Sequence, residues 1–253
     1  MSELELGKKK NQPIDVSLIA KFASLGFNKL TEIQKQAIPK ILEQKNSLII
    51  APTGSGKTEC SVIPVFSQIR KSKIPGKIKM LYITPLRALN RDVFRRIIDY
   101  GKIDGLDIKI RHGDTSQANR KKISDSPPDV LITTPETLVV LLSQRKYLSA
   151  LSHLEWVVID EVHELLPSER GSQLAISMER LQLNASQQVH RIGLSATVGN
   201  MSEAAKFLVG NNRKCEVIQD RSIRKYDVTV KFVDGGIYEV ADGIIDYVKE
   251  LKI

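Results

Sequence analysis

The sequence predicts an α/β fold with three layers, a three-layer sandwich in which helices cover both faces of a mostly parallel central sheet. Short apolar runs rich in β-forming residues recur along the chain, and helical patterns lie between most of them. Most of the runs are continuously apolar instead of alternating with polar residues, which is typical of parallel strands buried on both faces. A glycine-rich segment directly after the first run has the pattern of a phosphate-binding loop.

Six apolar runs are expected to form the strands of one sheet and to share one core. In a parallel sheet, the loops that follow the strands gather at one edge, where ligands bind in folds of this class. The predicted strands are residues 47–50, 79–84, 107–110, 129–133, 156–159 and 191–194.

The composition is that of an ordinary globular protein of 253 residues, long enough to bury a full core. No apolar run approaches the ~18 residues that a membrane helix needs, and residues 1–10 lack the apolar stretch of a signal peptide. We therefore expect a cytoplasmic location and no membrane partner. Cys60 and Cys215 are far apart and belong to no C-x-x-C, so neither a zinc site nor a disulfide framework is indicated. Both cysteines are expected to be buried.

The formal net charge of +9 favours a polyanionic partner such as nucleic acid. Lysine-rich surfaces also occur in proteins adapted to heat, so charge by itself leaves both explanations open. The nucleic-acid interpretation therefore depends on the motifs.

The chain divides into three predicted parts. Residues 1–12 form a flexible, lysine-rich N-terminus, and residues 13–220 form the ATP-binding domain. Residues 221–253 are a linker, with a strand at 226–233, a turn at 234–236 and a helix at 238–251. The chain stops directly after that helix without a further strand, so we expect it to be part of a longer protein.

The predicted phosphate-binding loop, residues 51–58, has the sequence A-P-T-G-S-G-K-T, with alanine where the general pattern begins with glycine. Backbone N–H groups in such a loop point at a triphosphate, the following helix offers its positive end, and Gly54 and Gly56 permit close approach. Lys57 is expected to reach the β- and γ-phosphates, and the Thr58 hydroxyl to reach Mg²⁺. The expected ATP-binding residues of the loop are Thr53, Gly54, Ser55, Gly56, Lys57 and Thr58.

A second motif, D-E-V-H at residues 160–163, follows the fifth apolar run. Asp160 is expected to hold Mg²⁺ opposite Thr58, partly through water, while Glu161 orients and deprotonates a water for in-line attack on the γ-phosphate. With Lys57, these carboxylates are the predicted catalytic residues. An isolated D-E-x-H can also be a surface acidic run, but the upstream phosphate loop weakens that alternative.

A third motif, Ser195-Ala196-Thr197, follows the sixth run. The hydroxyl groups of Ser195 and Thr197 are expected to hydrogen-bond the carboxylate and imidazole of the D-E-V-H segment. Together with His163 they would couple the two motifs. The alternative for His163 is a histidine that is simply packed or solvated.

Upstream of the loop, Gly26-Phe27 leads into an amphipathic helix with Thr31 as its expected N-cap. The Gln34 amide could read adenine, because it can donate to N7 and accept from the N6 amine, which distinguishes ATP from GTP. Local sequence also permits the alternative of a glutamine on the solvent face of the helix.

The phosphate loop, the D-E-V-H motif and the Ser-Ala-Thr motif together resemble motifs I, II and III of superfamily 2 helicases of the DEAD/DEAH-like, or DExH-box, type. Phe27 with Gln34 resembles the adenine-recognition motif of that superfamily, with Leu30 where a proline usually precedes the threonine. The resemblance implies a RecA-like P-loop NTPase domain whose cofactors are ATP and Mg²⁺.

Longer segments are similar to the large helicase-related (Lhr) group, and superkiller-like RNA helicases and their DNA-repair relatives share much of the pattern. The resemblance covers about residues 22–209. The segments that carry it are 82–90 (YITPLRALN), 128–138 (PDVLITTPETL), 169–171 (ERG) and 191–198 (RIGLSATV).

The resemblance also implies contacts to the backbone of DNA or RNA. Pro85 and Arg87 would correspond to motif Ia and Thr134 and Pro135 to motif Ib, and Gly113 is expected to join them. Turn N–H groups, threonine hydroxyls and an arginine suit sequence-independent binding of phosphates. Ordinary strand-to-helix turns are the alternative for each segment.

Helicases of this superfamily place ATP between two RecA-like domains, and an arginine finger from the second stabilises the transition state. The chain has no Q-x-x-G-R-x-x-R and no second strand-helix array after residue 197. We therefore expect the ATP-binding N-terminal domain of an ATP-dependent DNA or RNA helicase or translocase, monomeric as a fragment and with little activity by itself. The Lhr resemblance implies DNA and 3′ to 5′ movement. The alternatives are a remodelling module that hydrolyses ATP without separating strands, and a superkiller-like RNA helicase.

Overall fold

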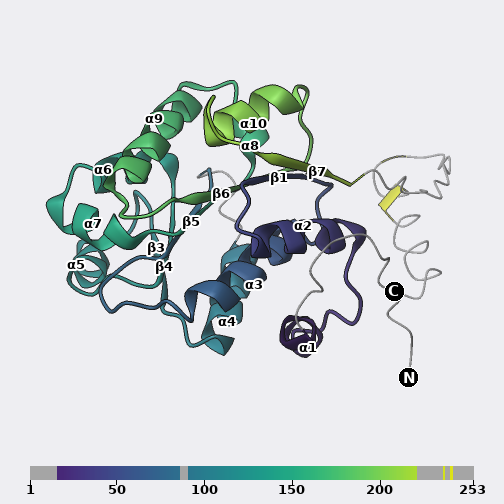
Figure 1. Ribbon diagram of the computed structural model, residues 1–253, viewed down its shortest axis with the longest axis horizontal. Coiled ribbons are helices and arrows are strands. Elements are labelled where there is room, and N and C mark those ends of the chain that lie inside the picture. Colours follow the sequence, from purple (N-terminus) through teal and green to yellow (C-terminus); the bar gives the residue numbers. More distant parts are fainter. Residues whose placement is uncertain (1–15, 86–90, 221–235, 237–239, 242–253) are drawn as a thin grey trace. The chain divides into compact units, whose positions relative to one another are not determined.

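The computed structural model describes residues 16–85, 91–220, 236 and 240–241 (Figure 1). The chain divides into two compact units after Asp220, and every element named below lies in the first. In that unit a seven-stranded sheet lies between two layers of helices. All of its strand pairs are parallel, which confirms the predicted three-layer α/β fold.

The strands occur in the order β3-β4-β2-β5-β6-β1-β7 across the sheet. The six predicted strands are all present, with ends that differ from the prediction by at most one residue. The strands are β1 (Ser47–Ile50), β2 (Met80–Ile83), β3 (Ile108–Arg111), β4 (Val130–Thr133), β5 (Trp156–Ile159), β6 (His190–Ser195) and β7 (Glu216–Gln219).

Sequence analysis missed the edge strand β7, which pairs only with β1 among the described strands. Its two ends are polar and Val217 is 42% exposed, so the segment contains no continuous apolar run. Strands at the edge of a sheet are less buried than central strands and carry a weaker hydrophobic signal.

One face of the sheet is covered by α1 (Val16–Ser24), α2 (Glu32–Leu42), α3 (Lys57–Ile69) and α4 (Arg91–Ile103) (Figure 1). The other face is covered by later helices and by the 3₁₀ turn η2 (Leu151–His153). These helices are α5 (Gln117–Asp125), α6 (Pro135–Leu141), α7 (Arg145–Ala150), α8 (Val162–Leu165), α9 (Glu169–Asn184) and α10 (Met201–Val209).

The expectation of a single core is wrong, because the sheet separates two. Ile49, Val158 and Leu194 belong to the cluster under α1–α4, whereas Ile83 and Leu131 belong to the cluster under the later helices. Successive side chains of a strand point to opposite faces, so a doubly covered sheet has two cores.

The cysteine prediction is right for one residue and wrong for the other. Cys60 in α3 is fully buried, whereas Cys215, just before the edge strand, is only partly buried. The burial of Cys215 is incomplete because β7 lies at the edge of the sheet.

Some sequence predictions lie outside the described residues. They are the N-terminus 1–12, the strand 226–233, residues 234 and 235 of the turn, the nucleic-acid residue Arg87 and most of the helix 238–251, of which residues 240 and 241 are described and helical. Within the part of the chain that the structure describes, no helix combines the length and the apolar character needed to cross a bilayer.

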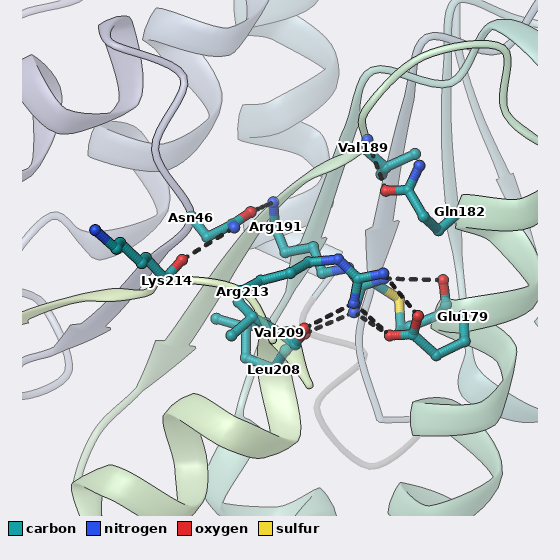
Figure 2. A network of polar contacts seen from close by, with 10 residues as sticks. Asn46, Glu179, Gln182, Val189, Arg191, Leu208, Val209, Arg213 and Lys214 are labelled. Carbon is teal, nitrogen blue, oxygen red and sulfur yellow. Dashed lines mark hydrogen bonds and ion pairs between the residues drawn. The ribbon is translucent and has the colours of Figure 1, made fainter. Parts of the chain in front are cut away.

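Polar contacts join several elements at the amino ends of the strands (Figure 2). Arg191, at the start of β6, is 1% exposed, and its guanidinium donates to Glu179 of α9 at 3.0 Å. It also donates to the carbonyl oxygens of Met178 at 3.1 Å and Leu208 at 3.2 Å. Arg213 binds both carboxylate oxygens of Glu179 at 2.8 Å.

Asn46, just before β1, completes this set, which we call the amino-end network: Arg191, Glu179, Arg213 and Asn46. The Asn46 side chain accepts from the Arg191 backbone N–H at 2.9 Å and donates to the Lys214 carbonyl at 3.1 Å (Figure 2). The network therefore connects β1 and β6 to α9 and to the segment that leads into β7.

Candidate nucleotide and nucleic-acid site

The order of the strands brings the three predicted motifs to neighbouring positions at the carboxyl ends of the sheet. Strand β6 lies between β1 and β5, with Ile50 opposite Ser195 and Ile159 opposite Gly193. The phosphate loop therefore begins beside the Ser-Ala-Thr motif, and the D-E-V-H motif lies on its other side. Residues more than 100 positions apart in the sequence form one site for this reason.

The phosphate loop has the backbone geometry that its glycines permit. Gly54 has φ 72° and Gly56 has φ 87°, both in the region that side-chain-bearing residues rarely adopt. A Cβ atom on Gly56 would lie 2.3 Å from the amide nitrogen of Gln34, so this position also requires glycine for packing. Helix α3 begins at Lys57, which directs its N-terminus into the loop.

The ammonium group of Lys57 lies inside the loop, and the residue is 8% exposed. It donates to the carbonyl oxygens of Ala51 and of Pro52, the latter at 3.1 Å. These neutral acceptors hold the cation at the place where the prediction puts the β- and γ-phosphates. Hydrogen bonds between charged partners are about twice as strong as neutral ones, so a phosphate would compete well for this lysine.

Asp160 is partly buried, and both of its carboxylate oxygens accept hydrogen bonds. The Tyr82 hydroxyl donates to Oδ2 at 2.6 Å, and the Glu161 backbone N–H donates to Oδ1 at 3.0 Å. Burial raises the pKa of Asp160, against the opposing effect of these two donors and of the charges of Lys57 and His163. These groups compensate only part of the cost of desolvating the Asp160 carboxylate.

Tyr82 is fully buried, and its hydroxyl has a second neighbour. Burial and the charge of Asp160 raise the pKa of Tyr82 well above its usual value, so the hydroxyl keeps its proton and donates it. The neighbouring Thr58 side chain acts in the opposite direction and lowers the pKa of Tyr82. Sequence reasoning gave Tyr82 no role, although a tyrosine in a buried aliphatic run needs a partner for its hydroxyl.

Glu161 adopts a left-handed backbone conformation, with φ 50° and ψ 47°. Gln44 is the only other non-glycine residue with positive φ among the described residues. Such a conformation costs about 1–2 kcal/mol and is concentrated at functional sites. Burial raises the pKa of Glu161, and the adjacent charge of Asp160 raises it further. A carboxyl with a raised pKa is suited to accept a proton.

His163 connects the D-E-V-H motif to the Ser-Ala-Thr motif. Its Nδ1 lies 3.1 Å from the Ser195 hydroxyl oxygen and 3.3 Å from Oε2 of Glu161. Because Ser195 donates its one proton to the Thr197 carbonyl at 2.9 Å, Nδ1–H is the donor to Ser195. The predicted contact between Ser195 and the imidazole is present. Thr197 contacts Ser195 through its backbone carbonyl, and the expected contact of its hydroxyl with the D-E-V-H segment stays a prediction.

The start of α2 is attached to the phosphate loop. Thr31 and Gln34 form a capping box, which confirms Thr31 as the N-cap. The Thr31 hydroxyl donates to the Ser55 carbonyl at 2.9 Å, and the Gln34 amide donates to the Gly56 carbonyl at 3.4 Å. Gln34 is 1% exposed, so the alternative of a solvent-facing glutamine is wrong.

Phe27 lies beside this helix start in an aromatic group. Its ring centroid is 5.8 Å from that of Phe22 and 6.4 Å from that of Tyr100, in edge-to-face arrangements. The packing fixes the position of the residue that resembles part of an adenine-recognition motif. Reading of adenine by Phe27 and Gln34 stays a prediction.

The predicted nucleic-acid segments follow β2, β3 and β4, which are neighbours in the sheet. Pro85 follows β2 and is buried, and Thr134 caps α6, accepting from the Thr137 N–H at 3.4 Å, with Pro135 in the first turn. Gly113 follows β3, and its carbonyl accepts a hydrogen bond from Arg120. These segments lie along one edge of the sheet, beside β5 and its acidic motif.

Three further contacts were not expected from the sequence. Arg170, at the start of α9, forms an ion pair with Glu136 in the segment that resembles motif Ib. Buried Glu59 of α3 accepts from Arg96 at 2.8 Å and from Tyr100 at 3.2 Å, both on α4. The partners are 34 to 41 residues apart, a separation at which charge patterns in the sequence give no signal.

The residues present fit a magnesium ion bound with a nucleotide. Thr58 and Asp160 supply oxygen ligands, which Mg²⁺ prefers, and Asp160 is held by the Tyr82 hydroxyl, which also has Thr58 as a neighbour. Among the described residues, no cluster of three or more histidine, cysteine or acidic side chains could hold a metal ion. This agrees with the usual Mg²⁺ site in phosphate-transfer proteins, where phosphates and water complete the coordination.

A parallel sheet that leads from β1 into a glycine-rich loop, with an acidic pair two strands away, defines the RecA-like class of P-loop domains. The sequence model of the DEAD/DEAH box helicase family matches residues 31–205. The chain belongs to this family.

Individual relatives agree with this assignment. The chain is 37% identical over 253 aligned positions to the ATP-dependent helicase Lhr-Core of Sulfolobus acidocaldarius, covering 92% of this chain and 29% of the relative. The structure of Mycobacterium smegmatis helicase Lhr bound to ssDNA and AMP-PNP is similar with a TM-score of 0.73 and 32% identity, over 92% of this chain and 32% of that one. The DEAD-box helicase Mss116 shares the fold, with a TM-score of 0.70 at 23% identity, over 82% of this chain and 44% of that one.

The chain thus spans about a third or less of the length of these Lhr relatives. The Lhr group, which the sequence resembles, is thus found among the relatives of this chain.

Proposed function

We propose that this chain is the ATP-binding domain of an ATP-dependent helicase or translocase that moves along single-stranded nucleic acid, with DNA as the preferred strand and movement from 3′ to 5′. The observation that carries the proposal is the convergence of Lys57, Thr58, Asp160 and Glu161 at adjoining strand ends. The likeness to a Lhr helicase bound to ssDNA and AMP-PNP supports DNA and ATP as ligands. A cytoplasmic location is part of the same proposal.

The roles of the residues follow from their positions. The backbone N–H groups of the loop and Lys57 would bind the β- and γ-phosphates, with Lys57 exchanging its carbonyl acceptors for them. Thr58 and Asp160 would hold Mg²⁺, which neutralises charge on the phosphates when bound. Gln34 and Phe27 are proposed to recognise adenine from the start of α2.

Glu161 is the proposed general base. Its carboxylate would take a proton from a water whose oxygen attacks the γ-phosphorus, while the bond to the bridging oxygen breaks and yields ADP and phosphate. The chain of contacts from Glu161 through His163 to Ser195 is proposed to transmit the state of this carboxylate to β6. A second RecA-like domain of the same protein would supply an arginine finger, typically worth ~10³ to 10⁵ in rate, so we expect little hydrolysis by this chain alone.

The nucleic acid is proposed to lie along the segments after β2, β3 and β4. Pro85, Arg87, Gly113, Thr134 and Pro135 would contact its backbone. Contacts of this kind bind phosphates without regard to sequence. The second candidate, an ATP-dependent remodelling module that separates no strands, would use the same contacts.

The proposal is tested by nucleotide binding to Lys57→Ala. We expect the variant to bind MgATP about 10- to 100-fold more weakly, because a charge-assisted contact is worth ~1.5 to 3 kcal/mol. Lys35→Ala is the matched control, since Lys35 is exposed on α2 and pairs with Glu32. Equal MgATP affinity in the Lys57 variant and the parent would contradict the phosphate-loop assignment.

A second measurement addresses the nucleic acid. Binding of single-stranded DNA and RNA of matched sequence should be weak and salt-dependent, with a log–log slope of about −1.4 to −2.8 for ~2 to 4 contacted phosphates. Tighter binding of RNA would replace DNA in the proposal. A complex whose affinity ignored salt would contradict the backbone contacts.

A further inference from the structure

Tyr82 occupies a position between the two residues that are proposed to hold Mg²⁺. It lies on β2, which pairs with β5, so that Tyr82 is opposite Val158 and its hydroxyl reaches Asp160, two residues further along. The distance from the hydroxyl oxygen to Oδ2 is 2.6 Å, and the tyrosine is fully buried. At this length the contact is a strong, charge-assisted hydrogen bond.

The Thr58 side chain is a second polar neighbour of the same hydroxyl. Thr58 lies in the first turn of α3, whereas Asp160 follows β5. Tyr82 therefore lies between the two elements that carry the proposed Mg²⁺ ligands. A phenol hydroxyl has one proton and two acceptor sites, which is enough to donate to one group and accept from the other.

The carboxylate of Asp160 is therefore held at both oxygens. Tyr82 fixes Oδ2 and the Glu161 backbone N–H fixes Oδ1 at 3.0 Å. Each carboxylate oxygen has a further acceptor site that these bonds leave available. A group that orients a metal-binding carboxylate in this way typically contributes 10- to 100-fold to metal affinity.

We propose that Tyr82 is a positioning residue for Mg²⁺, acting through Asp160 without touching the ion or the nucleotide. The inference rests on the proposed function. The role of Tyr82 can be tested separately from that function. Tyr82 would control the dependence of nucleotide binding on Mg²⁺ and leave metal-free nucleotide binding unchanged.

The test is a titration of MgCl₂ against binding of a fluorescent ATP analogue to Tyr82→Phe, in which the ring stays and the hydroxyl is lost. We expect the Mg²⁺ concentration for half-maximal binding to rise about 10- to 100-fold. Binding of the analogue in EDTA should match that of the parent. Tyr147→Phe is the control, because Tyr147 is equally buried and its hydroxyl has no hydrogen-bond partner among the described residues.

A midpoint for Tyr82→Phe within twofold of the parent would overturn the positioning role while leaving the proposed function intact. A parent whose analogue binding ignored Mg²⁺ would instead contradict the proposed function, and the role of Tyr82 with it. If Tyr82→Phe failed to fold, Tyr82→Met would replace it, since methionine also lacks a hydroxyl and fills irregular core space. An equal loss in EDTA and in MgCl₂ would indicate a merely structural role and reject the proposal.

Discussion

The two ends of the same parallel sheet bury charged groups in opposite ways. At the amino ends, the guanidinium of Arg191 faces the Glu179 carboxylate and two backbone carbonyl oxygens, and Arg213 shares that carboxylate (Figure 2). At the carboxyl ends, Asp160 and Glu161 are adjacent carboxylates that are both partly buried. Opposite charges meet at one end, and like charges meet at the other.

The pKa shifts have opposite directions for this reason. The hydrogen bond from Arg213 lowers the pKa of Glu179, with a further contribution from Arg191. Burial raises the pKa values of Asp160 and Glu161. The amino-end network therefore stabilises the fold by itself, whereas the carboxyl-end site is arranged for a ligand that brings positive charge and removes the mismatch.

The largest effect expected from this comparison concerns Glu161→Gln. In the protein that carries its second domain, ATP turnover should fall at least ~100-fold, because general-base assistance is typically worth that much. The free energy of unfolding of this chain should not fall, since the substitution removes a charge that repels Asp160. The measurements are steady-state hydrolysis and urea unfolding.

The control for Glu161→Gln is Glu164→Gln, which removes an exposed carboxylate three residues away. Its turnover should equal that of the parent. Near-normal turnover in Glu161→Gln would assign the base to another residue.

Removal of the carboxylate at the other end should act on stability instead. Glu179→Ala leaves Arg191 buried without its carboxylate, and we expect a loss of about 3 kcal/mol in urea unfolding, the low end for broken buried pairs because Glu179 is itself 47% exposed. Arg191→Met, which removes the buried charge and keeps much of its volume, should cost less. Affinity for MgATP should be unchanged in both variants.

Glu169→Ala, on the same helix and exposed, serves as the control for Glu179→Ala. It should change the free energy of unfolding by less than ~0.5 kcal/mol. If Glu179→Ala were as stable as this control, the amino-end network would contribute nothing to the fold.

The smallest expected effect is a difference in pH dependence between the two ends. The lowered pKa of Glu179 means that its stabilisation is present above the unfolded-state pKa and is lost as pH falls through the folded-state value. The raised pKa of Glu161 has the opposite effect, because the folded state binds the proton more tightly than the unfolded state does. The destabilisation by Glu161 therefore grows as pH rises from the unfolded-state pKa to the folded-state pKa. At higher pH the destabilisation stays constant.

Urea unfolding between pH 4 and pH 8 in EDTA would measure this difference. Relative to the parent, Glu161→Gln should gain stability as pH rises above the usual glutamate value of 4.5. Glu179→Ala should approach the parent only as pH falls below that value. The same sign of pH dependence in both variants would contradict the contrast between the ends.

Much of the fold was predictable because its signals are local. Six strands with apolar runs were found within one residue at each end, whereas β7 was missed because it is polar at both ends and partly exposed. The helix start at Thr31 was predicted from an N-cap residue in front of an amphipathic pattern. Patterns in neighbouring residues carry information about local backbone conformation and burial, which is why they succeed.

The sequence by itself determined the phosphate loop, the acidic pair and the helicase family, since each depends on contiguous residues whose backbone carries the chemistry. Only the tertiary structure decided the partners of those residues. Tyr82 meets Asp160 across 78 positions, and the Arg191 N–H meets Asn46 across 145. Such contacts depend on strand order and register, and a one-residue slip would turn every side chain of a strand to the opposite face of the sheet.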